Sequence, residues 1–144
     1  MGITVEPFAD CSTLPEVALP FMNKVHCEEL ALVGKLLSEL HTQPNVTLCD
    51  SLFAAWVQHT QEHFAREERL MQEHDFFAYP CHQGEHHQAL QTLLAVQQYW
   101  LTERDTSSII EYIDEWREWL QNHIATMDFV TAQYLSQFKL NVEN

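Results

Sequence analysis

The sequence predicts an all-α protein, an up-down-up-down four-helix bundle that follows an irregular N-terminal arm. The 144 residues include only three glycines and five prolines, which leaves little material for the turns of a β-sheet. Four segments repeat apolar residues every three or four positions, as amphipathic helices do. Because short connections join these segments, successive helices are expected to run antiparallel.

The chain is expected to form one domain. Residues 1–20 are predicted to form the arm, since the prolines within that stretch interrupt any helix. Residues 21–140 are predicted to form the bundle, a length that suffices for a single continuous core.

Each predicted helix has a recognisable start or end. The four apolar patterns cover residues 22–40, 53–74, 82–100 and 109–134. The segments HTQPN and DFFAYP end the first two patterns, and Pro80 suits the first turn of the third helix. Ser108 and Glu111 have the spacing of a capping box at the start of the fourth.

The composition argues against several partners. Lys and Arg total 7 against 21 Asp and Glu, a formal net charge of −14. Such a polyanion repels phosphate backbones and anionic lipids, so neither nucleic acid nor membrane is expected as a partner. No apolar run approaches the roughly 20 residues that span a bilayer, and no secretory signal is recognised. A cytoplasmic protein is expected, with free thiols at Cys11, Cys27, Cys49 and Cys81.

Histidines occupy inward positions on all four predicted helices, at His26, His63, His82, His86 and His123. Glu67 shares the face of His63, because residues four apart lie only about 40° apart around a helix. The same spacing lets His82 and His86 point at one place. A cluster is therefore expected rather than isolated core histidines.

The positions of these residues along their helices agree with one another. In an up-down-up-down bundle, the starts of helices one and three share an end with the finishes of helices two and four. The histidines of the first and third helices lie early in those helices, and those of the second and fourth lie in the later halves. All are expected to meet in the same half of the bundle.

Asp128 is a candidate on a different ground. It follows His123 by five residues, which places it about 140° round an ideal helix, so spacing alone does not nominate it. Its surroundings, IATMDFV, are apolar, and an ionised carboxylate there needs a partner or a metal ion.

The candidate ligands predict a particular class of metal site. Imidazoles and carboxylates without clustered thiols favour iron, zinc or copper over calcium or magnesium. Seven candidates are too many for one transition-metal ion and suit two ions that share carboxylates. The Glu-x-x-His motif of ferritin-type bundles does not occur in the chain, so a histidine-rich two-metal site is predicted.

The chain resembles the hemerythrin family over essentially residues 21–130. The matching segments are HCEEL from His26, HFAREERLM from His63, HQGEH from His82 and HIATMD from His123. The spacing from Glu67 to His82 and the closing His-x-x-x-x-Asp also match the family pattern. Among family members the chain looks most like a single-domain bacteriohemerythrin.

The resemblance implies a di-iron centre with an oxo or hydroxo bridge. It assigns three histidines to one iron: His82, His86 and His123. It assigns His26 and His63 to the other iron, and it makes Glu67 and Asp128 bridging ligands. The second iron keeps an open position where dioxygen binds and is reduced to a hydroperoxide.

The chain also departs from the family pattern. Bacterial members usually carry Asp three residues before the first ligand histidine and Gln immediately before it, whereas this chain has Asn23 and Val25. Gly84 stands between two proposed ligands, at a cost of about 1 kcal/mol relative to alanine in a helix interior. These differences concern the surroundings of the site and leave the ligand set intact.

The remaining histidines are interpreted as structural. His59, one turn before the second-helix ligand, is expected to hydrogen-bond near the site, with direct ligation as the alternative. His41 and His74 lie near helix C-termini, where positive charge is favourable. His87 and Glu68 are predicted to lie off the inward face.

These expectations lead to reversible dioxygen binding, for oxygen delivery, storage or sensing. Turnover of an organic substrate is not expected, because no general acid or nucleophile arrangement stands out. One alternative is a di-iron enzyme that reduces peroxide or nitric oxide. Another is a signalling module whose iron state alters binding to a partner protein.

Overall fold

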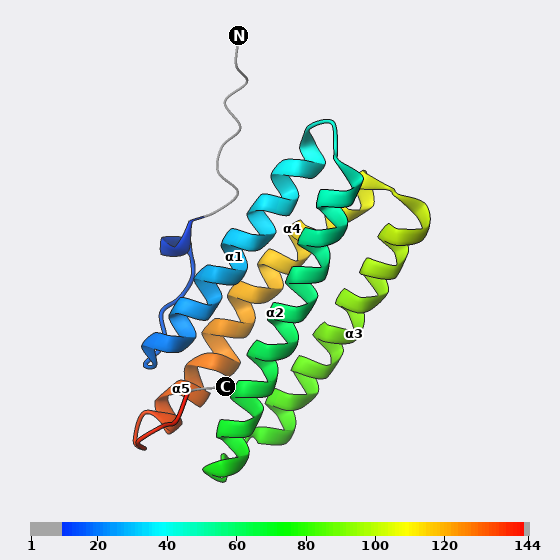
Figure 1. The fold of residues 1–144 in the computed structure, drawn as a ribbon. Coiled ribbons are helices and arrows are strands. Elements are labelled where there is room, and N and C mark those ends of the chain that lie inside the picture. Colours follow the sequence, from blue (N-terminus) through cyan, green and yellow to red (C-terminus); the bar gives the residue numbers. More distant parts are fainter. Residues whose placement is uncertain (1–9, 143–144) are drawn as a thin grey trace.

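The computed structural model describes residues 10–142, and they form the predicted bundle (Figure 1). Four long helices alternate in direction: α1 (Pro20–His41), α2 (Val46–Glu73), α3 (Tyr79–Glu103) and α4 (Thr106–His123). The fourth continues through a π-helical segment, η2 (Ile124–Asp128), into α5 (Phe129–Leu135). No strand occurs within the described residues, so the all-α prediction is confirmed.

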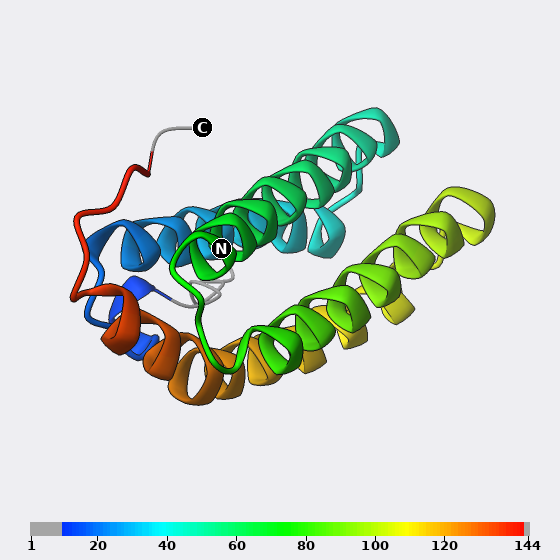
Figure 2. The same ribbon diagram turned by 90° about the horizontal axis from the view of Figure 1, so that it is seen from below.

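The helices pair as two hairpins, α1 with α2 and α3 with α4, which lie side by side (Figure 2). α1 also packs against α4, and α2 against α3, which closes the bundle. Large apolar side chains fill the half of the bundle near the α1–α2 and α3–α4 connections: Phe53, Trp56, Trp100, Ile109 and Ile113. In the opposite half, buried polar residues lie among the apolar ones.

Two helix starts test the predictions from local sequence. Pro80 lies in the first turn of α3, as predicted. The capping box predicted at Ser108 is wrong, because α4 begins earlier and Asp105 is its N-cap. The Asp105 carboxylate accepts hydrogen bonds from the backbone N–H and the hydroxyl of Ser108, at 3.2 and 2.7 Å. An aspartate is a strong N-cap acceptor, so it supplies the cap that the serine was expected to supply.

The described part of the arm is irregular apart from one 3-10 turn, η1 (Cys11–Thr13). Leu14, Val17 and Leu19 are nevertheless buried against the bundle. Asn23, in the first turns of α1, accepts the N–H of Val17 at 2.9 Å and donates to its carbonyl at 3.0 Å. An ionised aspartate could not make the second bond. Residues 1–9 of the predicted arm lie outside the described residues.

A disulfide joins Cys11 in the arm to Cys27 in α1, with Cα atoms 5.1 Å apart. The prediction of free thiols is therefore wrong for this pair. It rested on cysteine spacing, which does not show that the arm folds back along α1. Such bonds persist in oxidising compartments, so these cysteines give no support to the cytoplasmic expectation. Cys49, which is buried, and Cys81, which is exposed, carry free thiols as predicted.

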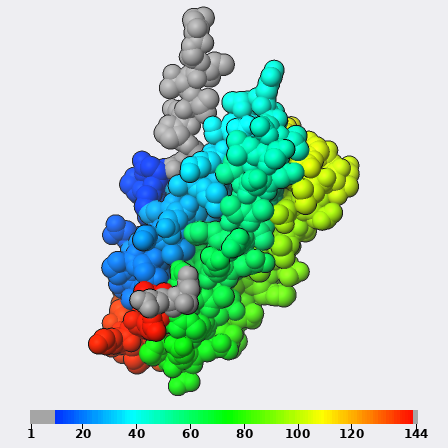
Figure 3. Space-filling model, viewed as in Figure 1, coloured from blue at the N-terminus to red at the C-terminus, as the bar shows by residue number. Residues whose placement is uncertain are grey.

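The segment after α5 folds back towards α2 (Figure 3). There the Asn141 carbonyl accepts a hydrogen bond from Arg69 at 3.0 Å. Among the described residues, no helix is both long enough and apolar enough to cross a membrane.

Candidate metal centre

The seven predicted residues meet in the half of the bundle away from the α1–α2 and α3–α4 connections, and each is at most 3% exposed. They form two groups, and within each group the ligand atoms lie within 4.8 Å of one another. The α1–α2 hairpin supplies the first group, His26, His63 and Glu67. The α3–α4 hairpin with η2 supplies the second, His82, His86, His123 and Asp128. Each hairpin thus provides one group.

Asp128 divides its two carboxylate oxygens between the groups. Its Oδ2 lies 3.0 Å from Nε2 of His26, across the bundle. Its Oδ1 lies 3.1 Å from Nε2 of His82 and 3.2 Å from Nε2 of His123. A carboxylate placed in this way can bind one metal ion through each oxygen.

Glu67, which belongs to the other hairpin, also directs one carboxylate oxygen at each group. Its Oε2 lies 2.5 Å from Nε2 of His63. Its Oε1 lies 3.5 Å from Nε2 of His82 and 3.4 Å from Nε2 of His86. Both carboxylates therefore present one oxygen to each group of imidazoles.

The π-helical segment η2 explains how Asp128 reaches the site. Within it the backbone N–H of Phe129 bonds the carbonyl of Ile124, five residues earlier, in place of the usual four. The wider turn holds one extra residue. Asp128 therefore returns to the face of His123, which an ideal helix would not allow.

Four of the five imidazoles have an acceptor at Nδ1, the nitrogen that faces away from the centre. The Thr131 hydroxyl donates to the Met127 carbonyl at 2.8 Å, so its oxygen accepts from His82 Nδ1 at 2.7 Å. This bond places the proton on Nδ1 and leaves the Nε2 lone pair of His82 directed at the centre.

Carboxylates are the Nδ1 acceptors for the other three histidines. Glu68 lies 3.0 Å from Nδ1 of His86. Glu85 lies 2.7 Å from Nδ1 of His123. Glu29, from α1, is the acceptor for His63. All three carboxylates hold a ring nitrogen that cannot reach the centre, and so orient the nitrogen that can.

Glu29 is 3% exposed and also lies 3.3 Å from Nδ1 of His59, while His63 Nδ1 lies at 3.4 Å. Burial raises the pKa of Glu29, but the hydrogen bonds to His59 and His63 outweigh burial and lower it to about 2. Glu29 is therefore an ionised carboxylate inside the bundle, paired with two imidazoles. The hydrogen-bonding role predicted for His59 is confirmed.

Without a metal ion, the same residues form buried ion pairs. Burial lowers the pKa of His123, but Asp128, Glu85 and Glu67 raise it to about 9. His123, His26 and His82 hold the pKa of Asp128 well below its usual value, against the effect of burial. Glu67 likewise has a lowered pKa, chiefly through His63, although burial and the Asp128 charge oppose this.

The unpaired atoms of the site fit a metal. Among residues 10–142, all but one of the buried side-chain nitrogen and oxygen atoms without a hydrogen bond belong to the predicted ligands. They include Nε2 of His26, His82, His86 and His123, with Oε1 of Glu67 and both oxygens of Asp128. Buried polar atoms that make no hydrogen bond are costly, so their concentration at one point fits a metal ion held among them. Imidazole nitrogens and carboxylate oxygens suit iron and its neighbours in the first transition row.

Sequence reasoning missed most of the residues that support these ligands. Glu68, predicted to lie off the inward face, is half-buried and contacts His86. Glu29, Glu85 and Thr131 were not predicted at all. The spacing from His82 to Glu85 and from Asp128 to Thr131, three residues each, is the one local signal for two of them. His87 is exposed, as predicted.

Comparison with known proteins agrees with this site. A family model described as the hemerythrin HHE cation binding domain matches residues 18–135. Bacteriohemerythrin from Aquifex aeolicus is 34% identical over 116 residues, which cover 80% of this chain and 88% of the relative. Bacteriohemerythrin from Ralstonia nicotianae is 30% identical over 87 residues, which cover 60% and 63% respectively. On the strength of this match over most of its length, the chain belongs to the hemerythrin family.

Proposed function

We propose that residues 21–140 act as a single domain that binds dioxygen reversibly at a non-haem di-iron centre. The proposed ligands are His26, His63, Glu67, His82, His86, His123 and Asp128. The observation that carries the proposal is the division of both carboxylates between the two imidazole groups. Relatives named bacteriohemerythrin and a cation-binding family model support the choice of iron and of dioxygen.

The two halves of the proposed centre are unequal. One ion would be held by three imidazoles and one oxygen of each carboxylate, whereas the other would be held by two imidazoles and the remaining oxygen of each carboxylate. The ion held by His26 and His63 would thus have one protein ligand fewer, which supports an open position for dioxygen there. When bound, the iron pair supplies the electrons with which dioxygen is held reversibly.

The protein contributes orientation and exclusion of water. The Nδ1 acceptors at Thr131, Glu29, Glu68 and Glu85 fix the imidazole rings. Phe64 stacks on His86, with ring centroids 3.9 Å apart, and Trp119 stacks on His123 at 4.7 Å. The aromatic cover keeps water from the centre, which favours return of bound dioxygen over irreversible oxidation.

A reversible oxygen titration tests the proposal. The purified protein is analysed for metal, reduced without air, and followed by visible spectroscopy as oxygen is added and withdrawn. Two irons per chain and a colour that comes and goes with oxygen are expected. Immediate conversion to a permanent ferric spectrum, or a single zinc ion per chain, would remove the oxygen-binding proposal.

The same preparation separates binding from turnover. We propose binding rather than catalysis, so consumption of peroxide or nitric oxide with an added reductant should not exceed the rate of autoxidation. Sustained consumption well above that rate would favour the enzyme alternative.

A further inference from the structure

A long groove on the surface separates α3 from α4. Two hollows of about 650 and 570 Å³ adjoin one another there and share Thr92 and Tyr112. Along α3 they extend from Cys81 to Tyr99, which is about 27 Å at about 1.5 Å per residue. None of the seven proposed metal ligands lines either hollow.

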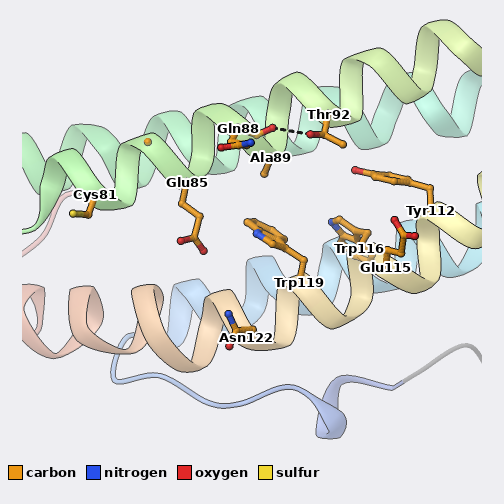
Figure 4. Close-up of a pocket in the computed structure, with 11 residues that line it drawn as sticks. Cys81, Glu85, Gln88, Ala89, Thr92, Tyr112, Glu115, Trp116, Trp119 and Asn122 are labelled. Carbon is orange, nitrogen blue, oxygen red and sulfur yellow. Dashed lines mark hydrogen bonds between the residues drawn. The ribbon is translucent and has the colours of Figure 1, made fainter.

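The larger hollow combines aromatic rings with negative charge (Figure 4). Tyr112, Trp116 and Trp119 come from α4, and the side chains of Glu85 and Trp119 lie in the space between the two helices. Glu85 and Glu115 add two carboxylates, and no lysine or arginine is among the residues that line either hollow. Burial, with the charges of Glu29 and Glu115, raises the pKa of Tyr112, so its hydroxyl stays a neutral donor.

This chemistry complements a cationic side chain. A guanidinium or ammonium group is attracted to the face of an aromatic ring and forms charge-assisted hydrogen bonds with carboxylates. The chain as a whole carries 21 acidic against 7 basic residues. A second copy of the same chain would bring like charge to the groove, so a basic partner is favoured over self-association.

The smaller hollow has different requirements. Ala95, Val96 and Ile109 line it, beside the ring of Tyr99, which is 41% exposed. Apolar side chains of a partner would fit there. The two hollows thus suit a cation and then apolar groups along about 27 Å. A helix of about 18 residues has this length, and one with an apolar face and basic flanks has this chemistry. A small cationic molecule would fill only the first part.

We propose that the groove between α3 and α4 binds a basic amphipathic helix of a partner protein. An arginine or lysine of that helix lies among Tyr112, Trp119 and Glu115, and its apolar face covers Ala95, Val96 and Tyr99. The proposal does not rest on the reaction with dioxygen, although Glu85 and Trp119 of the larger hollow also contact His123.

Isothermal titration of the purified full-length protein with synthetic helical peptides tests the proposal. A panel of about 18-residue peptides carries leucines at three- and four-residue spacing with arginines beside them. Companion peptides carry glutamine in place of arginine. The protein variant is Glu115→Lys, and Glu118→Lys is the matched control, because Glu118 is an exposed residue of the same helix outside both hollows. Metal content is measured on each variant to establish that the fold is intact.

The expected result is binding of at least one arginine peptide, weakened about tenfold or more by Glu115→Lys and less than about twofold by Glu118→Lys. Equal weakening by the two variants would show attraction by net charge alone and overturn the proposal. So would equal binding of the glutamine peptides, or no binding by any peptide. Arginine amide that binds as tightly as the peptides would show a small-molecule site instead. A dimer in sedimentation that Glu115→Lys dissociates would show a second copy in the groove.

Discussion

Oδ1 of Asp128 lies 3.2 Å from Nε2 of His123, although five residues separate the two in the chain. On an ideal α-helix this spacing would put the two side chains about 140° apart. The extra residue in η2 brings them to one face, because the backbone there bonds five residues back. One local change in helix pitch thus supplies a carboxylate to both imidazole groups.

Deletion of Ala125, an exposed residue of η2, should leave the Asp128 carboxylate facing the site. The deletion removes the extra residue, so the segment would close to an ordinary helical turn in which the aspartate follows His123 by four positions, about 40° away. Insertion of one further alanine beside Ala125 should instead turn the aspartate by about 100° away from His123. Metal analysis should give two ions per chain for the deletion and fewer than two for the insertion, while circular dichroism remains helical for both. Loss of metal from the deletion variant, or two ions on the insertion variant, would disprove the role given to η2.

Thr131→Val should weaken metal binding without direct loss of a ligand. The valine keeps the shape of threonine but cannot accept the hydrogen bond from Nδ1 of His82. Loss of a hydrogen bond that orients a ligand histidine typically lowers metal affinity roughly 10–100-fold. Competition with a chelator measures the affinity. Thr92→Val is the control, because the Thr92 hydroxyl also bonds a carbonyl four residues back, that of Gln88 at 3.0 Å. If both variants lose affinity equally, the effect lies in the helix and not in the orientation of His82.

The metal-free protein should be most stable at mildly acidic pH. The raised pKa of His123 gives stability that is complete below its unfolded value of 6.5 and is lost as pH rises through about 9. The lowered pKa values of Glu67 and Asp128 give stability that is present above 4.5 and 3.8 and is lost as pH falls.

Thermal unfolding of the metal-free protein from pH 5 to pH 9, by circular dichroism, checks these signs. The melting temperature should fall between about pH 6.5 and pH 9. The metal-loaded protein should not show this fall, because metal binding requires imidazoles without a proton on Nε2 and strengthens as pH rises. A melting temperature of the metal-free protein that rises over the same range would contradict the ion pairs described above.

Loss of the disulfide should lower the free energy of unfolding by up to about 3 kcal/mol. This is the contribution expected when a bond restricts the unfolded chain to a closed loop of about 15 residues. The bonded cysteines are separated by 16 residues. Urea denaturation of the oxidised protein and of Cys11→Ser measures the difference, and a reductant should destabilise only the former. Cys81→Ser, which removes an exposed free thiol, serves as the control. An oxidised protein that a reductant does not affect would show that the bond does not contribute.

Much of this molecule could be predicted from its sequence. The spacing of apolar residues predicted the four helices. The positions of the histidines along those helices predicted the half of the bundle in which they meet. The sequence did not predict the partners of those histidines. Glu68 and Glu85 are half-buried in the structure, and such glutamates look like surface residues in a sequence, because burial depends on the neighbouring helix.

Two further features escaped prediction for physical reasons. A π-helical turn breaks the 3.6-residue period on which the prediction of faces depends, so Asp128 could be nominated only through its apolar surroundings. The pairing of Cys11 with Cys27 depends on the path of an irregular arm, which has no period.

Each hairpin holds one group of imidazoles, and one carboxylate oxygen from each hairpin contacts the imidazoles of the other hairpin. Under the proposed ligand assignment, neither half of the chain would complete either ion by itself. A first ion held by both hairpins would fix the carboxylates that the second ion also needs. Uptake of the pair should be cooperative, with few molecules that hold a single ion. A limited supply of iron would then change the number of complete molecules, and not the degree to which each one is filled.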